Sequence, residues 1–191
     1  MTDNTPYPSQ TISSTASVEP AATAGSQRIA IEFDLNGTRE KHDVPTNTTV
    51  LDLLRDGCHK RSVRSSCERS VCGACTVLID DMPVAGCATF AYELDGSKVE
   101  TVEGLADGDG TLSPQQQAFR ECGGFQCGFC TSGMLMLTTA LLREKANPCR
   151  EDIREWISSN TCRCTGYEMI LESVERAAEL TTEKQSKEPS A

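Results

Sequence analysis

The chain has 191 residues, 11 of them cysteine, and its 18 basic and 28 acidic side chains give a formal net charge of −10. This acidic balance argues against a nucleic-acid binder, which usually carries a basic patch or stripe. There is no apolar run of about 18 residues, as a transmembrane helix would need, and the N-terminus lacks the basic start and apolar stretch of a secretory signal. We therefore expect a cytoplasmic protein. Thiols are kept reduced there, so the cysteines are interpreted as metal ligands or catalytic groups and not as disulfides.

The two ends of the chain are predicted to be disordered tails. Residues 1–27 are rich in Ser, Thr, Ala and Pro without a periodic apolar pattern, and residues 182–191 have a similar character. Such segments cannot bury enough apolar surface to offset the entropy of ordering. Between them we expect two small domains, at 28–104 and 105–181.

The first domain is predicted to be a small mixed α/β unit. Residues 28–35 alternate between polar and apolar side chains, as a half-buried strand does. Asn36-Gly37 is a strong hairpin signal, so residues 38–44 should return as the partner strand. The other elements expected here are a short helix after Thr48 or Thr49 that ends near Gly57, a strand at 76–80, a short strand reaching Cys87, and a strand at 98–102.

The second domain is predicted to be helical. Met134, Leu137 and Leu141 recur on one stripe, as on the buried face of an amphipathic helix. Pro148 should interrupt the chain after that helix. The expected helices lie at 114–121, 132–145, 150–158 and 167–180.

Eight of the cysteines form two sets of four. In the first set, Cys67, Cys72 and Cys75 follow the pattern C-x4-C-x2-C, and Cys87 comes after eleven further residues. This is the spacing of a plant-type [2Fe–2S] cluster. Gly73, between two of these cysteines, permits a positive φ and a close approach of the backbone to inorganic sulfide. Zinc is the alternative occupant, because four thiolates also suit that ion.

The second set consists of a CxxC pair and a CxC pair, each just before a predicted helix: Cys127, Cys130, Cys162 and Cys164. We expect Thr131 or Ser132 to cap one helix and Thr165 the other. The positive ends of two helices would then favour one anionic thiolate–sulfide cluster, and zinc again remains the alternative.

Three cysteines and the two histidines lie outside the two sets. Cys58, Cys122 and Cys149 are expected to be small buried hydrophobes, although Cys122 is a rival ligand because it lies five residues before Cys127. His42 and His59 are expected to be surface residues rather than ligands.

Three motifs together give a resemblance to a known family: CGACTV at 72–77, QCGFCTSGM at 126–134 and NTCRCTGY at 160–167. Over residues 28–180 the chain resembles the iron–sulfur subunit of the molybdenum hydroxylases, the family of xanthine dehydrogenase and aldehyde oxidase. It is most similar to the small subunit of bacterial three-subunit members such as carbon monoxide dehydrogenase.

The resemblance implies an α+β fold, with an N-terminal β-grasp domain like plant-type ferredoxins and a C-terminal four-helix domain. Each domain would hold one [2Fe–2S] cluster. The implied partners are a large subunit with molybdenum–molybdopterin, in its dinucleotide form, and a medium subunit with FAD, assembled as a dimer of heterotrimers. No substrate site is implied on this chain.

The resemblance also implies roles for particular residues. The cluster of the second cysteine set would lie nearer the molybdenum, and that of the first set nearer the FAD. Gln126 matches a residue that contacts the molybdopterin, and Cys164 matches a ligand that links the cluster to it. Tyr167 is expected to pack rather than to take part in redox chemistry. Electrons would leave one at a time during oxidative hydroxylation, with water as oxygen source, of an N-heterocycle, an aldehyde or carbon monoxide.

The chain departs from the family pattern at two places. Residues 68–71 (Glu-Arg-Ser-Val) stand where the family carries glycine, so any residue there with a positive φ would be disfavoured. A charge pair so close to a cluster could also shift its reduction potential. Ser132 stands where proline is common, and no loss is expected from it. Two other functions stay open: a free-standing ferredoxin carrier with two clusters, and a scaffold held by zinc without redox function.

Overall fold

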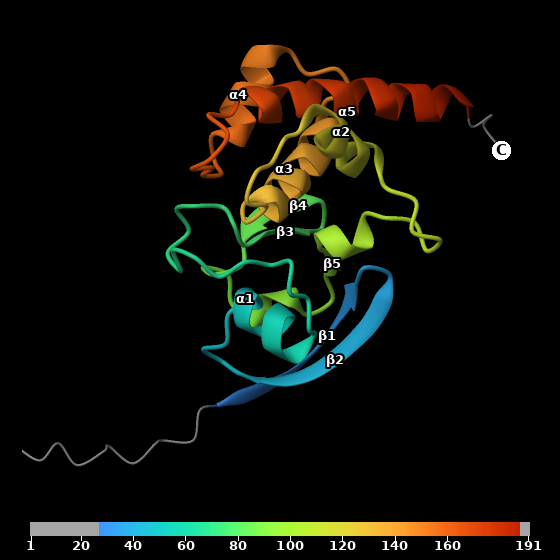
Figure 1. Cartoon of the computed structure of the whole chain (residues 1–191). Coiled ribbons are helices and arrows are strands. Elements are labelled where there is room, and N and C mark those ends of the chain that lie inside the picture. The colour runs from blue at the N-terminus through green and yellow to red at the C-terminus, as the bar shows by residue number, and fades with distance from the viewer. Residues whose placement is uncertain (1–26, 188–191) are drawn as a thin grey trace, which may run out of the picture.

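The computed structural model describes residues 27–187, which form a mixed sheet at one end and a group of helices at the other (Figure 1). Most of the predicted N-terminal tail and the last four residues lie outside this range. Both halves are built as the α+β pattern of the sequence predicts, with strands first and helices afterwards.

Five strands form one sheet in the order β2-β1-β5-β3-β4. Their bounds are β1 Arg28–Leu35, β2 Thr38–Pro45, β3 Thr76–Ile79, β4 Met82–Ala85 and β5 Lys98–Glu100. The predicted hairpin is confirmed, because β1 and β2 pair antiparallel around Asn36 and Gly37, which both have positive φ. Strand β5 runs parallel to β1 and antiparallel to β3, so it joins the two hairpins into one sheet.

A short helical segment covers one face of the β1–β2 hairpin (Figure 1). It consists of α1 Val50–Asp52 and a π-helical turn at Leu53–Gly57. The predicted cap is confirmed, since the Thr49 hydroxyl accepts a hydrogen bond from the backbone N–H of Asp52 over 3.1 Å. The core between this segment and the sheet is apolar throughout, and its fully buried members include Phe33, Leu35, Val50, Leu54, Leu94 and Val99.

The second half contains four of the five α-helices found among the described residues. Their bounds are α2 Pro114–Cys122, α3 Thr131–Glu144, α4 Arg150–Ile157 and α5 Glu168–Lys187. They surround a core that includes Phe119, Met134, Ile153, Ile157, Ile170 and Val174. Two short 3-10 turns, Ala91–Leu94 and Val102–Gly104, flank β5. No helix in residues 27–187 has both the length and the apolar character that crossing a membrane requires.

The C-terminal tail was predicted too long, because α5 continues through residue 187. The polar composition of residues 182–187 suggested disorder, but these residues include neither glycine nor proline, and a helix can continue through them. Side chains also support the extension: Thr182 donates to the carbonyl of Ala178, and Arg176 pairs with Glu183.

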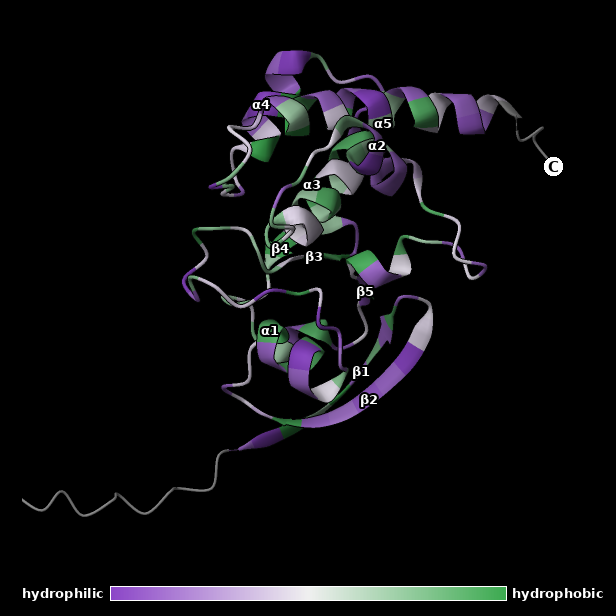
Figure 2. Ribbon diagram, viewed as in Figure 1, coloured by the Kyte–Doolittle hydropathy of each residue, from purple (hydrophilic) through white to green (hydrophobic). Residues whose placement is uncertain are grey.

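The two halves share an apolar contact and an ion pair. Leu78 of β3 packs against Met136 and Ala140 of α3, the helix that lies next to β3 and β4 in Figure 1. In Figure 2 the hydrophobic residues gather along α3, whereas β2 is mostly hydrophilic. Arg143, near the end of α3, donates to both carboxylate oxygens of Glu100 on β5, at 3.0 and 2.8 Å. The position of the helices relative to the sheet is therefore fixed by packing and by a bidentate contact.

Candidate metal centres

The fold brings the first four cysteines together at one end of the sheet. Cys67 and Cys72 lie in the long loop between the π-helical turn and β3. Cys75 immediately precedes β3, and Cys87 lies two residues after β4. Because β3 and β4 pair antiparallel, these two thiols come within hydrogen-bonding reach of each other. Cys67 and Cys72 form the other close pair.

Backbone N–H groups of the loop point at the sulfurs. The Cys67 sulfur accepts from the N–H groups of Val71 and Cys72, each over 3.4 Å, and the Cys87 sulfur accepts from that of Ser70 over 3.3 Å. Hydrogen bonds from backbone N–H groups, that of Arg69 first, lower the pKa of Cys67 to about 6. The loop is therefore arranged to stabilise negative charge on sulfur.

The departure from the family's glycine pattern has a visible consequence in this loop. Glu68 and Ser70 adopt left-handed backbone conformations, with φ of 53° and 58°. The loop thus has the positive φ values that glycine would supply freely, and non-glycine residues adopt them at an energetic cost. The expected positive φ of Gly73 is also found, at 67°.

The second four cysteines also converge, from two separate segments. Cys127 and Cys130 lie just before α3, and Cys162 and Cys164 lie between α4 and α5. The sulfurs of Cys127 and Cys164 are 3.6 Å apart, and Cys130 is paired with Cys162. All four line a cavity of about 260 Å³ that Cys72 of the first set also reaches.

The predicted caps of the helices beside this cavity are not formed as expected. Helix α3 begins at Thr131 with Cys130 at the N-cap position, and the hydroxyls of Thr131 and Ser132 are buried without a partner. The backbone is already near-helical at Cys130, so neither hydroxyl occupies the position from which it could cap. Thr165 accepts from the N–H of Tyr167 over 3.1 Å, just before α5, and lies 3.2 Å from the Cys162 sulfur.

The pairing of the sulfurs distinguishes iron clusters from single zinc ions. Zinc–sulfur bonds of about 2.3 Å in a tetrahedron would place every two of four sulfurs about 3.8 Å apart. A group this compact has three or more ligand atoms within 4.8 Å of one another. Residues 27–187 contain one such group, formed by Glu40, His42 and Cys58. Neither cysteine set forms such a compact group. Two pairs of thiols in each set fit two irons with two thiolates each, so the residues present suit [2Fe–2S] clusters.

The two cysteine sets meet through backbone contacts. The N–H of Thr161 donates to the carbonyl of Cys72 over 2.9 Å. A Cβ on Gly73 would lie 2.8 Å from the carbonyl oxygen of Ser159 and 2.9 Å from Cγ of Asn160. Asn160 is fully buried, and neither polar atom of its side chain has a partner. Our reading of the sequence missed Asn160, although it stands at the start of the motif NTCRCTGY.

The second set is open to the surface on one side. Cys127, Cys164 and Gln126 are exposed, and Phe125 and Phe129 expose 42% and 45% of their surface. Phe129 also lines the cavity of the second set, whose surface is mostly apolar. Exposed aromatic side chains gathered beside an apolar cavity are typical of a surface that another protein covers.

Tyr167 has a structural role, in line with the packing role expected from the sequence. Its hydroxyl accepts from the N–H of Cys162 over 2.9 Å and donates to the carbonyl of Asn160 over 3.2 Å. The ring packs against the helical core. Tyr167 therefore holds the loop that carries Cys162.

Of the five residues outside the two sets, only His59 fully matches the expectation, and Cys58 is half-buried rather than buried. Cys149 is exposed at the N-cap of α4, whereas we expected it to be buried, and Cys122 is only half-buried at the end of α2. His59 is exposed as expected, but the side chain of His42 is only 20% exposed. Its ring stacks on Phe33, which explains why this strand position is covered.

Comparisons with known proteins agree with this architecture. Residues 33–106 match the family model of a 2Fe-2S iron-sulfur cluster binding domain, and residues 101–175 match that of a [2Fe-2S] binding domain. The nicotine 6-hydroxylase small subunit of Paenarthrobacter nicotinovorans is 44% identical over 149 residues, 78% of this chain and 89% of that protein. The xanthine dehydrogenase iron-sulfur-binding subunit of Escherichia coli O157:H7 is 44% identical over 153 residues, covering 78% and 94%.

Solved structures show the same relationship. Quinoline 2-oxidoreductase from Pseudomonas putida 86 aligns with a TM-score of 0.78 at 39% identity, over 83% of this chain and 98% of that one. Aldehyde oxidoreductase from Desulfovibrio desulfuricans aligns with a TM-score of 0.77 at 35% identity, over 81% of this chain and 17% of the longer one.

Two adjoining iron–sulfur domains, each with four converging thiols, define an electron-transfer protein with two [2Fe–2S] clusters. The chain belongs to the family of iron–sulfur subunits of the molybdenum hydroxylases, which includes those of xanthine dehydrogenase and aldehyde oxidoreductase. It is a subunit of an oxidoreductase complex, and its larger partners are further subunits of that complex.

Proposed function

We propose that this chain relays electrons from a molybdenum–molybdopterin centre in a large subunit to FAD in a medium subunit. The direct backbone contact between the two cysteine sets supports this proposal most strongly. A relay needs two centres held at a fixed, short separation, and the Thr161–Cys72 hydrogen bond joins a ligand of the first set to the neighbour of a ligand of the second.

We assign one [2Fe–2S] cluster to each cysteine set. The ligands of the first cluster would be Cys67, Cys72, Cys75 and Cys87, and those of the second would be Cys127, Cys130, Cys162 and Cys164. Bound there, the clusters would supply one-electron redox chemistry. The protein's own contribution is to orient the thiolates and to direct N–H groups at their sulfurs, which favours the more negative state and sets the potential.

The exposed side of the second set would face the molybdenum subunit. Gln126 and Cys164 are both exposed there, so they are accessible to a pterin cofactor held by a partner. Phe125 and Phe129 would be covered in the same contact. The first set would then lie toward the FAD subunit.

The finer architecture belongs to the same proposal. We place the β-grasp domain at residues 28–104 and a four-helix domain, made of α2 to α5, from residue 105 onward. The complete assembly would be a dimer of heterotrimers in the cytoplasm. Its reaction would be the oxidative hydroxylation of an N-heterocycle, an aldehyde or carbon monoxide, on a partner subunit and not on this chain.

Isolation from the native cell tests the proposal. A tagged full-length chain is expected to co-purify with two larger subunits, together with molybdenum and FAD, and with about four irons per copy of this chain. The alternative, a free-standing ferredoxin with two clusters, predicts a chain that elutes alone with both clusters intact. That result would contradict the relay between subunits but not the ligand assignment.

A further inference from the structure

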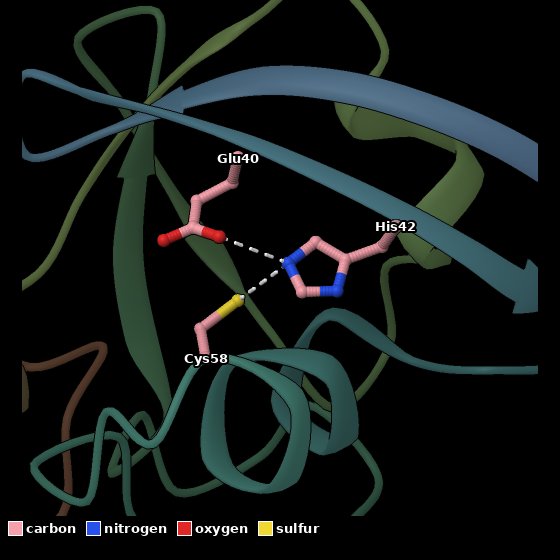
Figure 3. Close-up of side chains that lie close together, drawn as sticks. All are labelled: Glu40, His42 and Cys58. Carbon is pink, nitrogen blue, oxygen red and sulfur yellow. Dashed lines mark hydrogen bonds and ion pairs between the residues drawn. The ribbon is translucent and has the colours of Figure 1, made fainter.

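Glu40, His42 and Cys58 form a cluster of potential metal ligands outside both cysteine sets (Figure 3). Glu40 and His42 are two residues apart on β2, so their side chains lie on the same face of the strand. Cys58 follows the π-helical turn, which ends at Gly57. The cluster therefore joins a strand to the segment that leads into the loop of the first cysteine set.

The distances in this cluster match those of ligands on one metal ion. The Nε2 atom of His42 lies 3.2 Å from Oε2 of Glu40 and 3.4 Å from the sulfur of Cys58. In a tetrahedral zinc site, bond lengths of about 2.0 Å to N and O and about 2.3 Å to S give separations of about 3.3 Å for N···O and about 3.5 Å for N···S. Both observed distances agree with these separations within about 0.2 Å.

The carboxylate of Glu40 and the thiol of Cys58 share one ring nitrogen of His42. Figure 3 shows the carboxylate and the thiol converging on the same ring nitrogen of His42. That nitrogen has a single in-plane position, which holds either a proton or a lone pair. It can therefore donate to Glu40 or accept from Cys58, and an N–H that serves both atoms does so only as a divided, three-centre bond. A divalent cation between the three atoms would bind all of them at once.

The surroundings hold the three groups in place. The ring of His42 stacks on the buried Phe33, with centroids 6.0 Å apart. The N–H of Cys58 donates to the carbonyl of Leu53 over 2.9 Å, which closes the π-helical turn. Such turns are rare and occur frequently at functional sites.

We propose that Glu40, His42 and Cys58 bind one divalent transition-metal ion such as zinc, with a water molecule as fourth ligand. One thiolate, one imidazole and one carboxylate form a mixed ligand set that suits zinc. The ion would tie β2 to the start of the segment that runs from Cys58 to Cys67. This proposal is independent of the electron relay, because it uses none of the eight cysteines assigned to the clusters.

Zinc uptake by the full-length chain that carries both clusters tests the site. After incubation with Zn²⁺ and removal of excess metal, we expect one zinc per chain, with the iron content unchanged. Zinc K-edge X-ray absorption should show one sulfur neighbour at about 2.3 Å and nitrogen or oxygen neighbours at about 2.0 Å. Four sulfur neighbours would mean that zinc had entered a cysteine set, and would overturn the proposal.

Variants identify the ligands. Cys58→Ser should remove the sulfur neighbour, and His42→Gln should weaken zinc binding at least about ten-fold, since even the loss of partners in the outer shell costs that much. The matched controls are Cys149→Ser and His59→Asn, which change an exposed cysteine and an exposed histidine outside the cluster and should bind zinc like the wild type.

The iron content checks that each variant has folded. If Cys58→Ser loses iron, Glu40→Gln is the ligand variant to use in its place. Glu40 lies near the surface and can be changed without altering the core. No zinc uptake by the wild type, or uptake that is unaltered in the ligand variants, would overturn the site.

Discussion

The backbone N–H of Thr161 donates to the carbonyl oxygen of Cys72, and this one hydrogen bond connects the loops of the two cysteine sets. A second contact is made by two glycines, Gly73 in the first loop and Gly133 in α3. A Cβ on Gly133, at the start of α3, would lie 2.3 Å from the carbonyl oxygen of Gly73. No side chain fits between the two loops at this point.

Gly133→Ala is therefore expected to destabilise the protein. The added methyl group would meet the Gly73 backbone and, at 2.5 Å, Nδ2 of Asn160. Overpacking of this kind costs about 1–3 kcal/mol, which exceeds the gain of about 1 kcal/mol in helix propensity. Thermal unfolding followed by circular dichroism, with iron analysis, measures the effect. Gly108→Ala is the matched control, since a Cβ there meets nothing within 4 Å; equal unfolding temperatures for both variants would show that the loops can separate without cost.

Cys164→Ser should change one of the two electron-paramagnetic-resonance signals of the reduced protein. The sulfur of Cys164 lies 3.6 Å from that of Cys127 in the second set. Cys164 forms no close sulfur pair with a cysteine of the first set. The signal of the first cluster should therefore keep its shape and intensity. Cys149→Ser serves as the control, because Cys149 is exposed at the start of α4. Two unchanged signals in Cys164→Ser would show that the ligand assignment is wrong.

Arg143→Met should remove a contribution to stability that depends on pH. The hydrogen bonds from Arg143 lower the pKa of Glu100 to about 2 from its ordinary value of 4.5. A carboxyl group with a depressed pKa stabilises the folded state fully above pH 4.5, and this contribution is lost as the pH falls from 4.5 to 2. We expect Arg143→Met to cost about 1–2 kcal/mol at pH 7, a value reduced for the partial exposure of Arg143.

Urea unfolding at a series of pH values measures that contribution. The difference between wild type and Arg143→Met should shrink as the solution is acidified. Arg154→Met is the control, because Arg154 and its partner Glu151 are both well exposed and 4.0 Å apart. A difference that stays constant with pH would mean that Arg143 acts only through packing.

Ser70→Gly should stabilise the loop of the first cysteine set. Ser70 has a φ of 58°, and its N–H donates to the Cys87 sulfur. Glycine adopts this conformation freely and keeps the hydrogen bond. Removing the left-handed strain contributes about 1–2 kcal/mol. The glycine also adds entropy to the unfolded chain, so the net gain in the free energy of unfolding is about 0.5–1 kcal/mol.

The neighbouring residue supplies the control for this change. The φ of Arg69 is not positive, so Arg69→Gly should bring no such gain. Thermal unfolding of the protein with its clusters bound compares the two. If Ser70→Gly is as stable as Arg69→Gly or less stable, the left-handed backbone at Ser70 carries no strain.

Local patterns were sufficient to predict most of the secondary structure. The strand pattern at 28–35 and the Asn36-Gly37 turn correspond to β1 and its hairpin. The cysteine spacing also indicated both sets of four thiols. These features depend on residues close together in sequence, where periodicity and turn chemistry act directly.

Features that depend on the tertiary fold were not predicted. Asn160 is buried because α3 and the loop of the first cysteine set pack around it, and no local pattern shows this. His42 was expected on the surface, but stacking on Phe33 and the nearby Cys58 cover it. The cap of α3 was misplaced because the chain becomes helical earlier than the hydroxyl residues suggest.

The contact between Gly73, Gly133 and Asn160 also bears on how such proteins can be rearranged. The spacing of the two cysteine sets is fixed where the loops meet, and not by the covalent connection through residues 106–113. That connection can therefore vary in length, or be opened to create new termini, without moving one redox centre relative to the other. Evolution could fuse this module to other polypeptides, or separate it from them, while the distance between its two cysteine sets stayed the same.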